Sequence, residues 1–236
     1  MNKSLAFFGR DKQLKQLRRL YAQRKHVLVV GPAGIGKTAL LRQIRQTCPV
    51  LLCEETSSLR RICDGIERQL GWNHYKLKVV ERKNRLLAYL GRRGEPVAFD
   101  HVALTPPRIS QFMGALGEQI PIWISCRSSV STAIGHVWQH LYKFERIEIS
   151  PLTAAETRRL ILAAVAAGNI QKNARDHIRE LHRMSRGNPR ILEELLIELA
   201  AREYKIDSDF GLNLLALDRE IHEIDLAVKA AAQENT

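Results

Sequence analysis

The sequence predicts an α/β fold in which a five-stranded parallel sheet is flanked by helices and followed by a small all-helical lid. Two observations lead to this expectation. Five short apolar runs, each bounded by residues that break regular structure, alternate with helix-like stretches over the first 150 residues. This alternation is typical of a parallel sheet covered on both faces. After Ser150 the strand signals stop, and only helical patterns follow.

The strands and helices of this core can be placed in order along the chain. The apolar runs span residues 26–30, 50–53, 96–100, 121–126 and, more weakly, 147–149. Helix-like stretches lie around residues 38–47, 57–70, 78–91, 107–117 and 131–141. We therefore expect one α/β core over residues 1–150.

Residues 151–236 are expected to form the helical lid and a C-terminal helix. Thr153 and Glu156 form a T-x-x-E capping box, and the helix that they begin is expected to end near Gly168. Further helices are expected over about 174–185, from Asn188 to about 203, and over about 211–231. The last one carries an apolar stripe made of Leu214, Leu217, Ile221, Ile224 and Val228. The stripe predicts docking on the lid, with pairing to a partner as the alternative.

The composition is that of a folded protein without a membrane span. A chain of 236 residues with 45% hydrophobic and 26% charged residues can build one large α/β domain with a small satellite, which argues against wholesale disorder. No 18 apolar residues run together, and the N-terminus lacks the apolar stretch of a signal peptide, so a cytoplasmic location is expected. The cysteines lack metal-site spacing and are expected to be buried and reduced: Cys48, Cys53, Cys63 and Cys126.

The net charge suggests a class of partner. Lys and Arg number 37 against 25 Asp and Glu, which gives a formal charge of +12 at pH 7. A cationic surface gains affinity for nucleic acid by releasing counterions from its phosphates. The alternative is a protein that is basic around its own nucleotide and merely soluble elsewhere.

The strongest motif is G-x-x-x-x-G-K-T, which reads Gly31-Pro32-Ala33-Gly34-Ile35-Gly36-Lys37-Thr38. It follows a predicted buried strand and opens a predicted helix, with Ala39 next in the helix, and this is the context that a phosphate-binding loop requires. The glycines let backbone N–H groups surround phosphates, and the helix N-terminus adds partial positive charge. Lys37 is expected to reach the β- and γ-phosphates, and the Thr38 hydroxyl to ligate Mg²⁺. The motif predicts binding of ATP with Mg²⁺.

A loop of this kind also needs an acid at the end of a neighbouring strand to hold Mg²⁺. Val97-Ala98-Phe99-Asp100 supplies one, and an ordinary turn aspartate is the alternative. In many such ATPases a second acid follows and activates water, but His101 follows here. Either His101 or another group orients the water, or hydrolysis is slow and the protein acts as a binding switch.

On these residues the chain resembles the AAA+/STAND group of P-loop ATPases, particularly members close to the origin-recognition and Cdc6-like branch. Beside the loop and Asp100, Phe8-Gly9-Arg10 with Leu14 and Leu17 is similar to the F-G-R-x-x-x-L segment of the group. The resemblance implies that Phe8 and Arg10 lie beside the adenine.

Two further segments carry the resemblance. Ile122 to Arg127 is similar to a strand that ends in Ser/Thr-x-Arg, which implies that Arg127 senses the γ-phosphate; an exposed arginine after a strand is the alternative. Gly187-Asn188-Pro189-Arg190 is similar to the G-x-P element of the lid, which implies that Pro189 packs on the nucleotide and that Arg190 is a second sensor or a plain surface residue. Few residues follow Arg190, so we expect the ATPase engine alone, acting through oligomers or another protein.

The segment between Tyr75 and Gly94 is a candidate surface for nucleic acid. It carries seven cations against the single acid Glu81: Lys76, Lys78, Arg82, Lys83, Arg85, Arg92 and Arg93. In the AAA+ group this stretch often faces a central channel or nucleic acid, and a solvated basic helix face is the alternative. The nearby aromatic residues Trp72, Tyr75 and Tyr89 could stack on bases, but we expect core packing.

The function predicted from these features is an oligomerising ATPase of the AAA+/STAND type that acts with DNA as an accessory of replication, transposition or mobile-element maintenance. Lys37, Asp100 and Arg127 are the expected catalytic residues. In the resemblance an arginine finger from a neighbouring subunit corresponds to Lys143 or Arg146. The alternative is a slow-hydrolysing switch that binds ATP and recruits a protein. A small-molecule kinase is less well supported, because no acceptor-site motif is recognisable.

Overall fold

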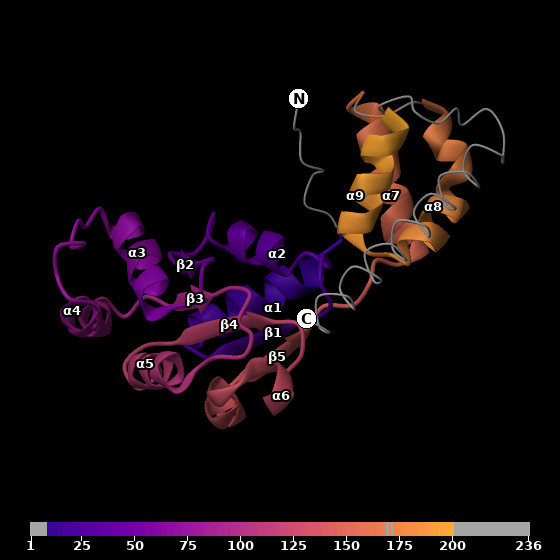
Figure 1. Ribbon diagram of the computed structural model, residues 1–236. Coiled ribbons are helices and arrows are strands. Elements are labelled where there is room, and N and C mark those ends of the chain that lie inside the picture. The colour runs from indigo at the N-terminus through magenta and orange to yellow at the C-terminus, as the bar shows by residue number, and fades with distance from the viewer. Residues whose placement is uncertain (1–8, 169, 171, 201–236) are drawn as a thin grey trace, which may run out of the picture. The chain divides into compact units, whose positions relative to one another are not determined.

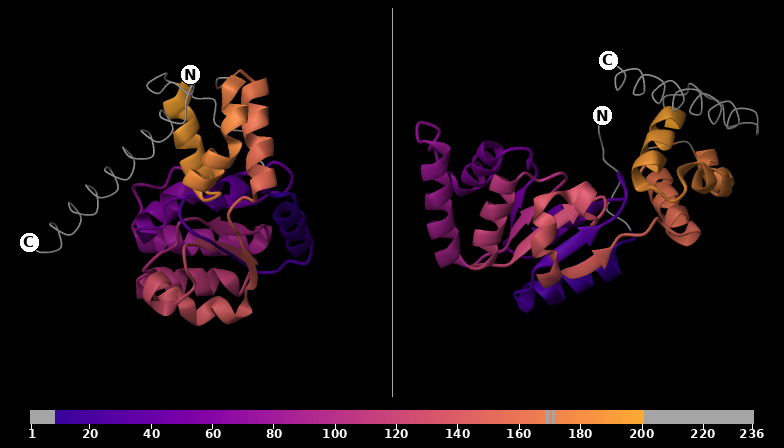
Figure 2. Two further views of the ribbon diagram at one scale, coloured as in Figure 1. Left: turned by 90° about the vertical axis from the view of Figure 1, so that its right-hand side faces the viewer. Right: turned by 60° about the horizontal axis from the view of Figure 1, so that its bottom comes forward.

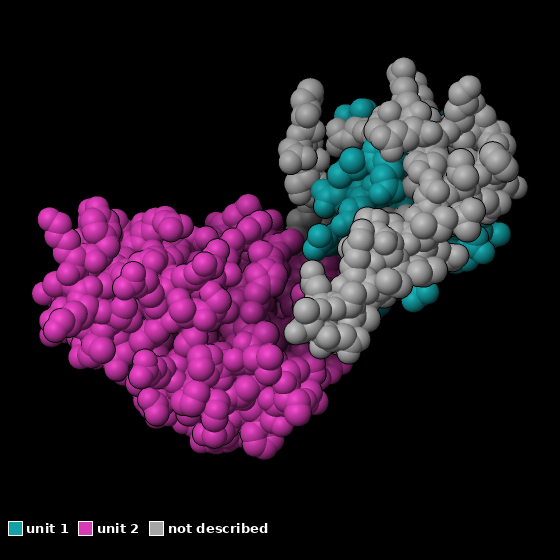
Figure 3. Space-filling model, in the orientation of Figure 1, with its two compact units in different colours: residues 1–8, 151–236 teal, residues 9–150 magenta. Residues whose placement is uncertain are grey.

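The computed structural model describes residues 9–168, 170 and 172–200. The chain divides into two compact units, Gly9–Ser150 and a second unit that contains the helices after Pro151, which Figure 3 colours separately. Phe8 and the expected C-terminal helix over 211–231 with its apolar stripe lie outside the described residues.

The unit Gly9–Ser150 is built on a five-stranded sheet whose strand pairings are all parallel, in the order β2-β3-β4-β1-β5 (Figure 1). This confirms the predicted fold class. The strands are β1 (Val27–Val30), β2 (Leu51–Cys53), β3 (Val97–Phe99), β4 (Ile122–Cys126) and β5 (Glu145–Glu148). The first four match the predicted apolar runs to within one residue at either end.

The fifth strand was misplaced by the sequence reading, which expected residues 147–149. β5 starts at Glu145 and lies at the edge of the sheet, where Ile147 is its only buried residue. An edge strand that covers the core with one face shows alternating burial rather than a continuous apolar run. The charged residues Glu145, Arg146 and Glu148 therefore belong to the strand.

Helices cover both faces of the sheet (Figures 1 and 2). Side chains of β4 alternate between the two faces: Ile122 and Ile124 join the cluster beneath α3, α4 and α5, whereas Trp123 meets the ring of Tyr21 in α1 at 6.4 Å. The helices of this unit are α1 (Asp11–Ala22), α2 (Lys37–Ile44), α3 (Leu59–Leu70), α4 (Val79–Arg93), α5 (Pro107–Gly117), α6 (Ser131–Ile134) and the 3₁₀-helix η1 (His136–Lys143).

The stretch expected as one helix over 131–141 is divided at Gly135, which is a correction. Gly135 has a φ of 70°, in the left-handed region that breaks a right-handed helix. A Cβ atom at this position would lie 2.5 Å from the backbone nitrogen of Thr105, so a close approach of two backbones also requires glycine. The short α6 therefore ends at Ile134, and the 3₁₀-helix η1 begins at His136.

The second unit is a helical bundle whose core contains Leu160, Leu181 and Leu192. Its helices are α7 (Ala154–Ala166), η2 (Lys172–His177), α8 (Ile178–Ser185) and α9 (Pro189–Ala200). The predicted capping box is present, because the Thr153 backbone N–H donates to Glu156 Oε2 at 2.8 Å while the Glu156 N–H donates to Thr153 Oγ1 at 3.2 Å. The helix expected over 174–185 begins instead with the 3₁₀ turns of η2.

The cysteines are all free and buried, as expected. Burial raises the pKa of Cys53 to about 12 and those of Cys63 and Cys126 to about 11, which keeps these thiols protonated and unreactive. Among the described helices none is long and apolar enough to cross a membrane.

Candidate nucleotide-binding site

The G-x-x-x-x-G-K-T loop connects the end of β1 to the start of α2, at the carboxyl edge of the sheet. Gly36 has a φ of 100°, a conformation that only glycine adopts without strain. A Cβ atom on Gly31 would lie 2.9 Å from the carbonyl oxygen of Ile149, so this glycine lets the loop pass close to the chain after β5. Ile35, in the middle of the loop, is buried and fixes the loop to the protein interior.

Arg10 holds this loop from the side of α1. Its guanidinium is buried, and Nη2 donates to the carbonyl oxygen of Ile35 at 3.0 Å. The predicted contact of Arg10 with the adenine stays a prediction, and its observed contact is with the loop that binds phosphate in the motif.

Lys37 is folded back onto the loop. Its ammonium group donates to the carbonyl oxygens of Gly31 at 2.6 Å and Pro32 at 2.8 Å, and the residue is 6% exposed. Desolvation by burial lowers the pKa of Lys37, and the nearby Asp100 carboxylate works in the opposite direction. A buried ammonium group whose two observed hydrogen-bond partners are neutral carbonyls is well placed to exchange them for an anionic oxygen.

Asp100 follows β3, which is separated from β1 by β4, and its carboxylate reaches the start of α2 at the end of the loop. It is fully buried, and its Oδ2 accepts a hydrogen bond from the Thr38 hydroxyl at 2.6 Å. The hydroxyl of Ser125, a buried residue of β4, donates to Asp100 Oδ1. Thr38 at the start of α2, Asp100 after β3 and Ser125 in β4 therefore form one hydrogen-bonded chain.

Ser125 is a site residue that the sequence reading missed. The strand from Ile122 to Arg127 was recognised, but a role was given only to Arg127. A hydroxyl in the middle of a fully buried strand is the signal that could have pointed to it, because a buried hydroxyl needs a partner.

His101 lies beside this hydrogen-bonded chain, on the side that faces solvent. Its backbone adopts a left-handed φ of 54°, and its N–H lies 3.3 Å from Ser125 Oγ. The ring atom Nε2 is 3.2 Å from Thr38 Oγ1 and 3.4 Å from Asp100 Oδ2. The side chain is 65% exposed, so it borders both the buried acid and solvent.

Arg127 is exposed just beyond the end of β4. It lies near enough to Lys37 for its charge to help lower the pKa of that lysine. Within the described residues Arg127 forms no ion pair with a carboxylate. Pro189 and Arg190 belong to the other compact unit, where the Arg190 side chain is 71% exposed and pairs with Glu194 at 3.0 Å. Their contact with a nucleotide stays a prediction.

The sequence predicts Arg82 as one of the surface cations of the basic segment before β3, and this prediction is wrong. Arg82 is 3% exposed and forms ion pairs with Glu67 at 2.6 Å and with Asp64 of α3. It joins α4 to α3 and is unavailable to a ligand. Lys76, Lys78, Arg85 and Arg92 are exposed.

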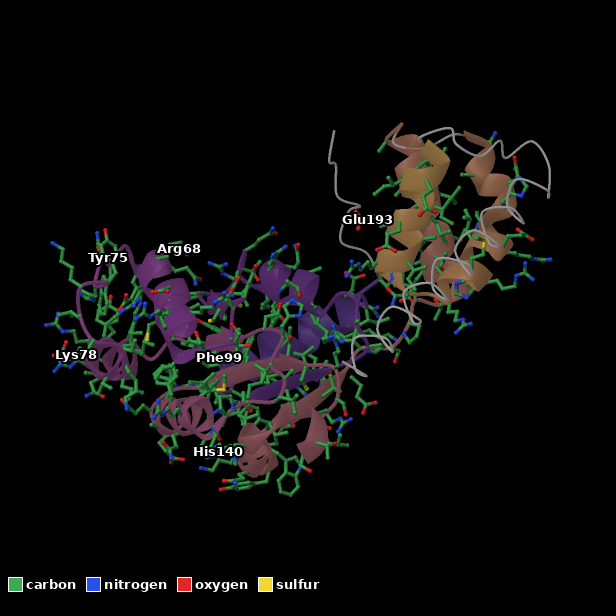
Figure 4. All side chains as sticks on the ribbon, viewed as in Figure 1. Arg68, Tyr75, Lys78, Phe99, His140 and Glu193 are labelled. Carbon is green, nitrogen blue, oxygen red and sulfur yellow. The ribbon has the colours of Figure 1, made fainter. Side chains whose placement is uncertain are left out.

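Of the aromatic residues in this region, Trp72 packs against the core cluster, as expected, whereas Tyr75 and Tyr89 are exposed, contrary to the expectation. Tyr75 is 71% exposed, and the half-buried Trp72 packs against the ring of Tyr89 at 4.6 Å. Figure 4 shows Tyr75 and Lys78 beside the α3–α4 connection, with Arg68 at the end of α3. A cleft of about 410 Å³ lies here, lined by Trp72, His74, Arg85, Ala88, Tyr89 and Arg92.

The two candidates for an arginine finger are both engaged in contacts within the described residues. Lys143 pairs with Glu118 at 2.6 Å, and Arg146 pairs with Glu148 at 2.8 Å and donates to Ser129 Oγ at 2.9 Å. Their role between subunits stays a prediction.

Known proteins resemble this chain in sequence pattern and in fold. The profile of the AAA ATPase domain matches residues 6–205. Cdc6p from Pyrobaculum aerophilum is similar in structure at 20% sequence identity, with a TM-score of 0.63 over 85% of this chain and 63% of its own. Orc1 of Aeropyrum pernix, solved in complex with DNA, is similar at 17% identity, with a TM-score of 0.55 over 94% of this chain and 62% of its own.

A STAND protein of Pyrococcus horikoshii with a tetratricopeptide repeat sensor is similar at 15% identity, with a TM-score of 0.53 over 92% of this chain and 33% of its own. At these identities the likeness concerns the fold. The chain spans less than two thirds of the length of each of these three proteins. No curated protein matches the chain.

Proposed function

The chain belongs to the AAA ATPase domain family, and from this membership we propose that it binds and hydrolyses ATP with Mg²⁺ at the loop formed by residues 31–38. The observation that carries the proposal is the 2.6 Å contact between Thr38 Oγ1 and Asp100 Oδ2. These residues are 62 positions apart in the sequence. Their meeting at the loop places a hydroxyl and a carboxylate, the ligand types that Mg²⁺ takes, beside the phosphate cradle.

Each residue of the site has a definite task in this proposal. Backbone N–H groups of the loop and the N-terminus of α2 surround the phosphates, and Lys37 turns from its two carbonyl partners to a phosphate oxygen. Thr38 and Asp100 hold the cation, which neutralises charge on the phosphates when it is bound. Ser125 donates to Asp100 Oδ1 and thereby fixes the direction of the carboxylate.

Arg127 is proposed to distinguish ATP from ADP. Its guanidinium is exposed at the carboxyl edge of the sheet and acts electrostatically on Lys37, so the added charge of a γ-phosphate is within reach of its influence. We expect Arg127→Ala to weaken ATP binding roughly tenfold, in line with the loss of one charge-assisted hydrogen bond, and to leave ADP binding nearly unchanged. Titration calorimetry with both nucleotides measures this. The control is Arg108→Ala, which removes another exposed arginine, and equal losses for ATP and ADP in Arg127→Ala would contradict the sensor role.

DNA is the proposed macromolecular partner. The net charge of +12 favours a polyanion. The cleft beside α4 combines the exposed cations Arg85 and Arg92 with Trp72 and Tyr89, whose rings suit stacking on bases. One structurally similar protein, Orc1 of Aeropyrum pernix, was solved with DNA. We further propose that the chain works as an oligomer, in replication, transposition or mobile-element maintenance.

Charge reversal tests the DNA surface. The variant Lys76→Glu/Lys78→Glu/Arg85→Glu/Arg92→Glu is expected to weaken binding of duplex and single-stranded DNA strongly. The salt slope of the binding constant should fall by about 0.7–0.9 for each phosphate that the protein no longer neutralises. Fluorescence anisotropy at several salt concentrations measures both quantities. A matched control reverses four exposed cations of α1, namely Lys12, Lys15, Arg18 and Arg19. If both variants lose affinity equally, the effect is one of net charge and not of this surface.

A slow-hydrolysing switch that recruits a protein is the second candidate. It is favoured by His101, which stands where the resemblance implies a water-activating acid. Steady-state ATP hydrolysis with and without duplex DNA, against a Lys37→Ala background, separates the two. Stimulation by DNA supports the DNA-dependent engine. Tight ATP binding with negligible turnover in both conditions supports the switch.

A further inference from the structure

Three donor atoms from different side chains converge beside the phosphate loop. Thr38 Oγ1 lies 2.6 Å from Asp100 Oδ2 and 3.2 Å from His101 Nε2, and the histidine nitrogen lies 3.4 Å from the same carboxylate oxygen. Two of the atoms are oxygens of the kind expected at a Mg²⁺ site. The third is an imidazole nitrogen, which the sequence reading considered only in relation to the attacking water.

The spacing of these atoms matches one face of a cation's coordination shell. Divalent cations of this size hold octahedral ligands at about 2.1 Å, so neighbouring ligands are separated by about 3 Å. The three distances between Thr38, Asp100 and His101 bracket that value. Resting on the proposed nucleotide site, we propose that His101 Nε2 is a third protein ligand of the cation that accompanies the nucleotide.

The backbone around His101 supports this placement. Asp100 and Ser125 are both fully buried, and the His101 N–H lies 3.3 Å from Ser125 Oγ, whose hydroxyl donates to Asp100. The left-handed φ of 54° at His101 turns its side chain back toward Thr38 and away from the continuation of the strand. Because one serine contacts both the acid and the histidine backbone, the two ligands keep a fixed relation to each other.

The chemical consequence is a change of metal preference. An imidazole nitrogen suits later first-row transition metals such as Co²⁺, Ni²⁺ and Zn²⁺, whereas Mg²⁺ prefers oxygen donors. Hydroxyl, carboxylate and imidazole together therefore form a site that accepts Co²⁺ with nucleotide more tightly than an all-oxygen site does. The described residues contain no group of three His, Cys, Asp or Glu side chains that could hold a metal. Asp100 and His101 therefore need the Thr38 hydroxyl as the third ligand of the proposed cation site.

The test uses the full chain with ADP and Mn²⁺ and observes the nitrogen directly. Electron spin-echo envelope modulation of bound Mn²⁺ is expected to show coupling to a histidine nitrogen, which changes when histidine is labelled with ¹⁵N. His101→Asn should abolish the coupling; asparagine tolerates the left-handed backbone and replaces the ring with an amide. The control is His136→Asn, which changes an exposed histidine of η1 and should retain the coupling.

Calorimetry supplies the second readout. In His101→Asn the ratio of ADP affinity with Co²⁺ to that with Mg²⁺ is expected to fall about tenfold, because the nitrogen donor contributes little to Mg²⁺. If ADP binds with Mg²⁺ and Mn²⁺ but the wild-type protein shows no histidine coupling, the ligand role is overturned while the proposed function stands. If ADP binds with none of these metals, the nucleotide site itself is wrong and the ligand role falls with it.

Discussion

Lys37→Ala is expected to lower the affinity for ATP by about 10²- to 10⁴-fold. In the structure the Lys37 ammonium makes two hydrogen bonds, to the carbonyl oxygens of Gly31 and Pro32, and is almost entirely removed from solvent. Exchange of these partners for phosphate oxygens gives charge-assisted hydrogen bonds worth about 1.5–3 kcal/mol each. Loss of two such bonds corresponds to the stated range of affinity.

Titration calorimetry with ATP and Mg²⁺ measures this loss, with Lys25→Ala as a control that removes an exposed lysine of the same unit. The fold should survive the change at Lys37, since burial disfavours its charged form and the lowered pKa reflects that cost. A thermal unfolding curve close to that of the wild type therefore accompanies the expected result. An affinity within threefold of the wild-type value would show that the loop does not bind phosphate in this way.

Arg82→Ala is expected to cost about 3–5 kcal/mol of the free energy of unfolding, the range found when one partner of a buried ion pair is removed. Glu67 is 2% exposed, and its carboxylate accepts hydrogen bonds from Arg82 Nε and Nη2 at 2.6–3.1 Å. Without the guanidinium, the buried Glu67 carboxylate is left without its main partner. The pairing also raises the pKa of Arg82 beyond its ordinary value, through the Glu67 hydrogen bond first.

Urea unfolding followed by tryptophan fluorescence is suited to this test, because Trp72, Trp123 and Trp138 all lie in the unit that contains the ion pair. Arg93→Ala is the matched control: Arg93 pairs with Glu95 at 2.9 Å but is solvent-exposed, so its loss should cost no more than about 1 kcal/mol.

A double variant separates pairing from packing. Replacement of both buried partners, as Arg82→Met/Glu67→Leu, is expected to recover most of the stability that Arg82→Ala loses, since the remaining carboxylate, Asp64, is 42% exposed to solvent and no buried charge is left unpaired. If Arg82→Ala destabilises no more than Arg93→Ala, the α3–α4 junction does not depend on the ion pair.

Most of the core fold followed from local patterns in the sequence. β1 to β4 are fully buried strands and read as short apolar runs, and the Thr153 capping box is specified by two residues three positions apart. β5 was shifted, because an edge strand with one buried residue has no apolar run. The helix break at Gly135 was missed, since its cause is a close approach to the distant Thr105 backbone.

The α4 surface shows why charge counting alone was insufficient. Arg82 lies one helical turn before Leu86 and two before Leu90, and all three are buried on the same face of α4. This periodicity could have indicated an inward-facing arginine. Its carboxylate partner could not be identified, because Glu67 and Asp64 lie on another helix whose packing is a tertiary property.

The sequence by itself determined the phosphate loop, the strand that precedes Asp100 and the succession of strands and helices along the chain, because these depend on residues close together in the chain and on hydrophobic periodicity. Only the tertiary structure decided how the site is assembled. The parallel register of β1, β3 and β4 brings Thr38, Asp100 and Ser125 into one hydrogen-bonded chain. The left-handed backbone at His101 then sets an imidazole nitrogen beside them, and such contacts between distant residues exist only after the strands have paired.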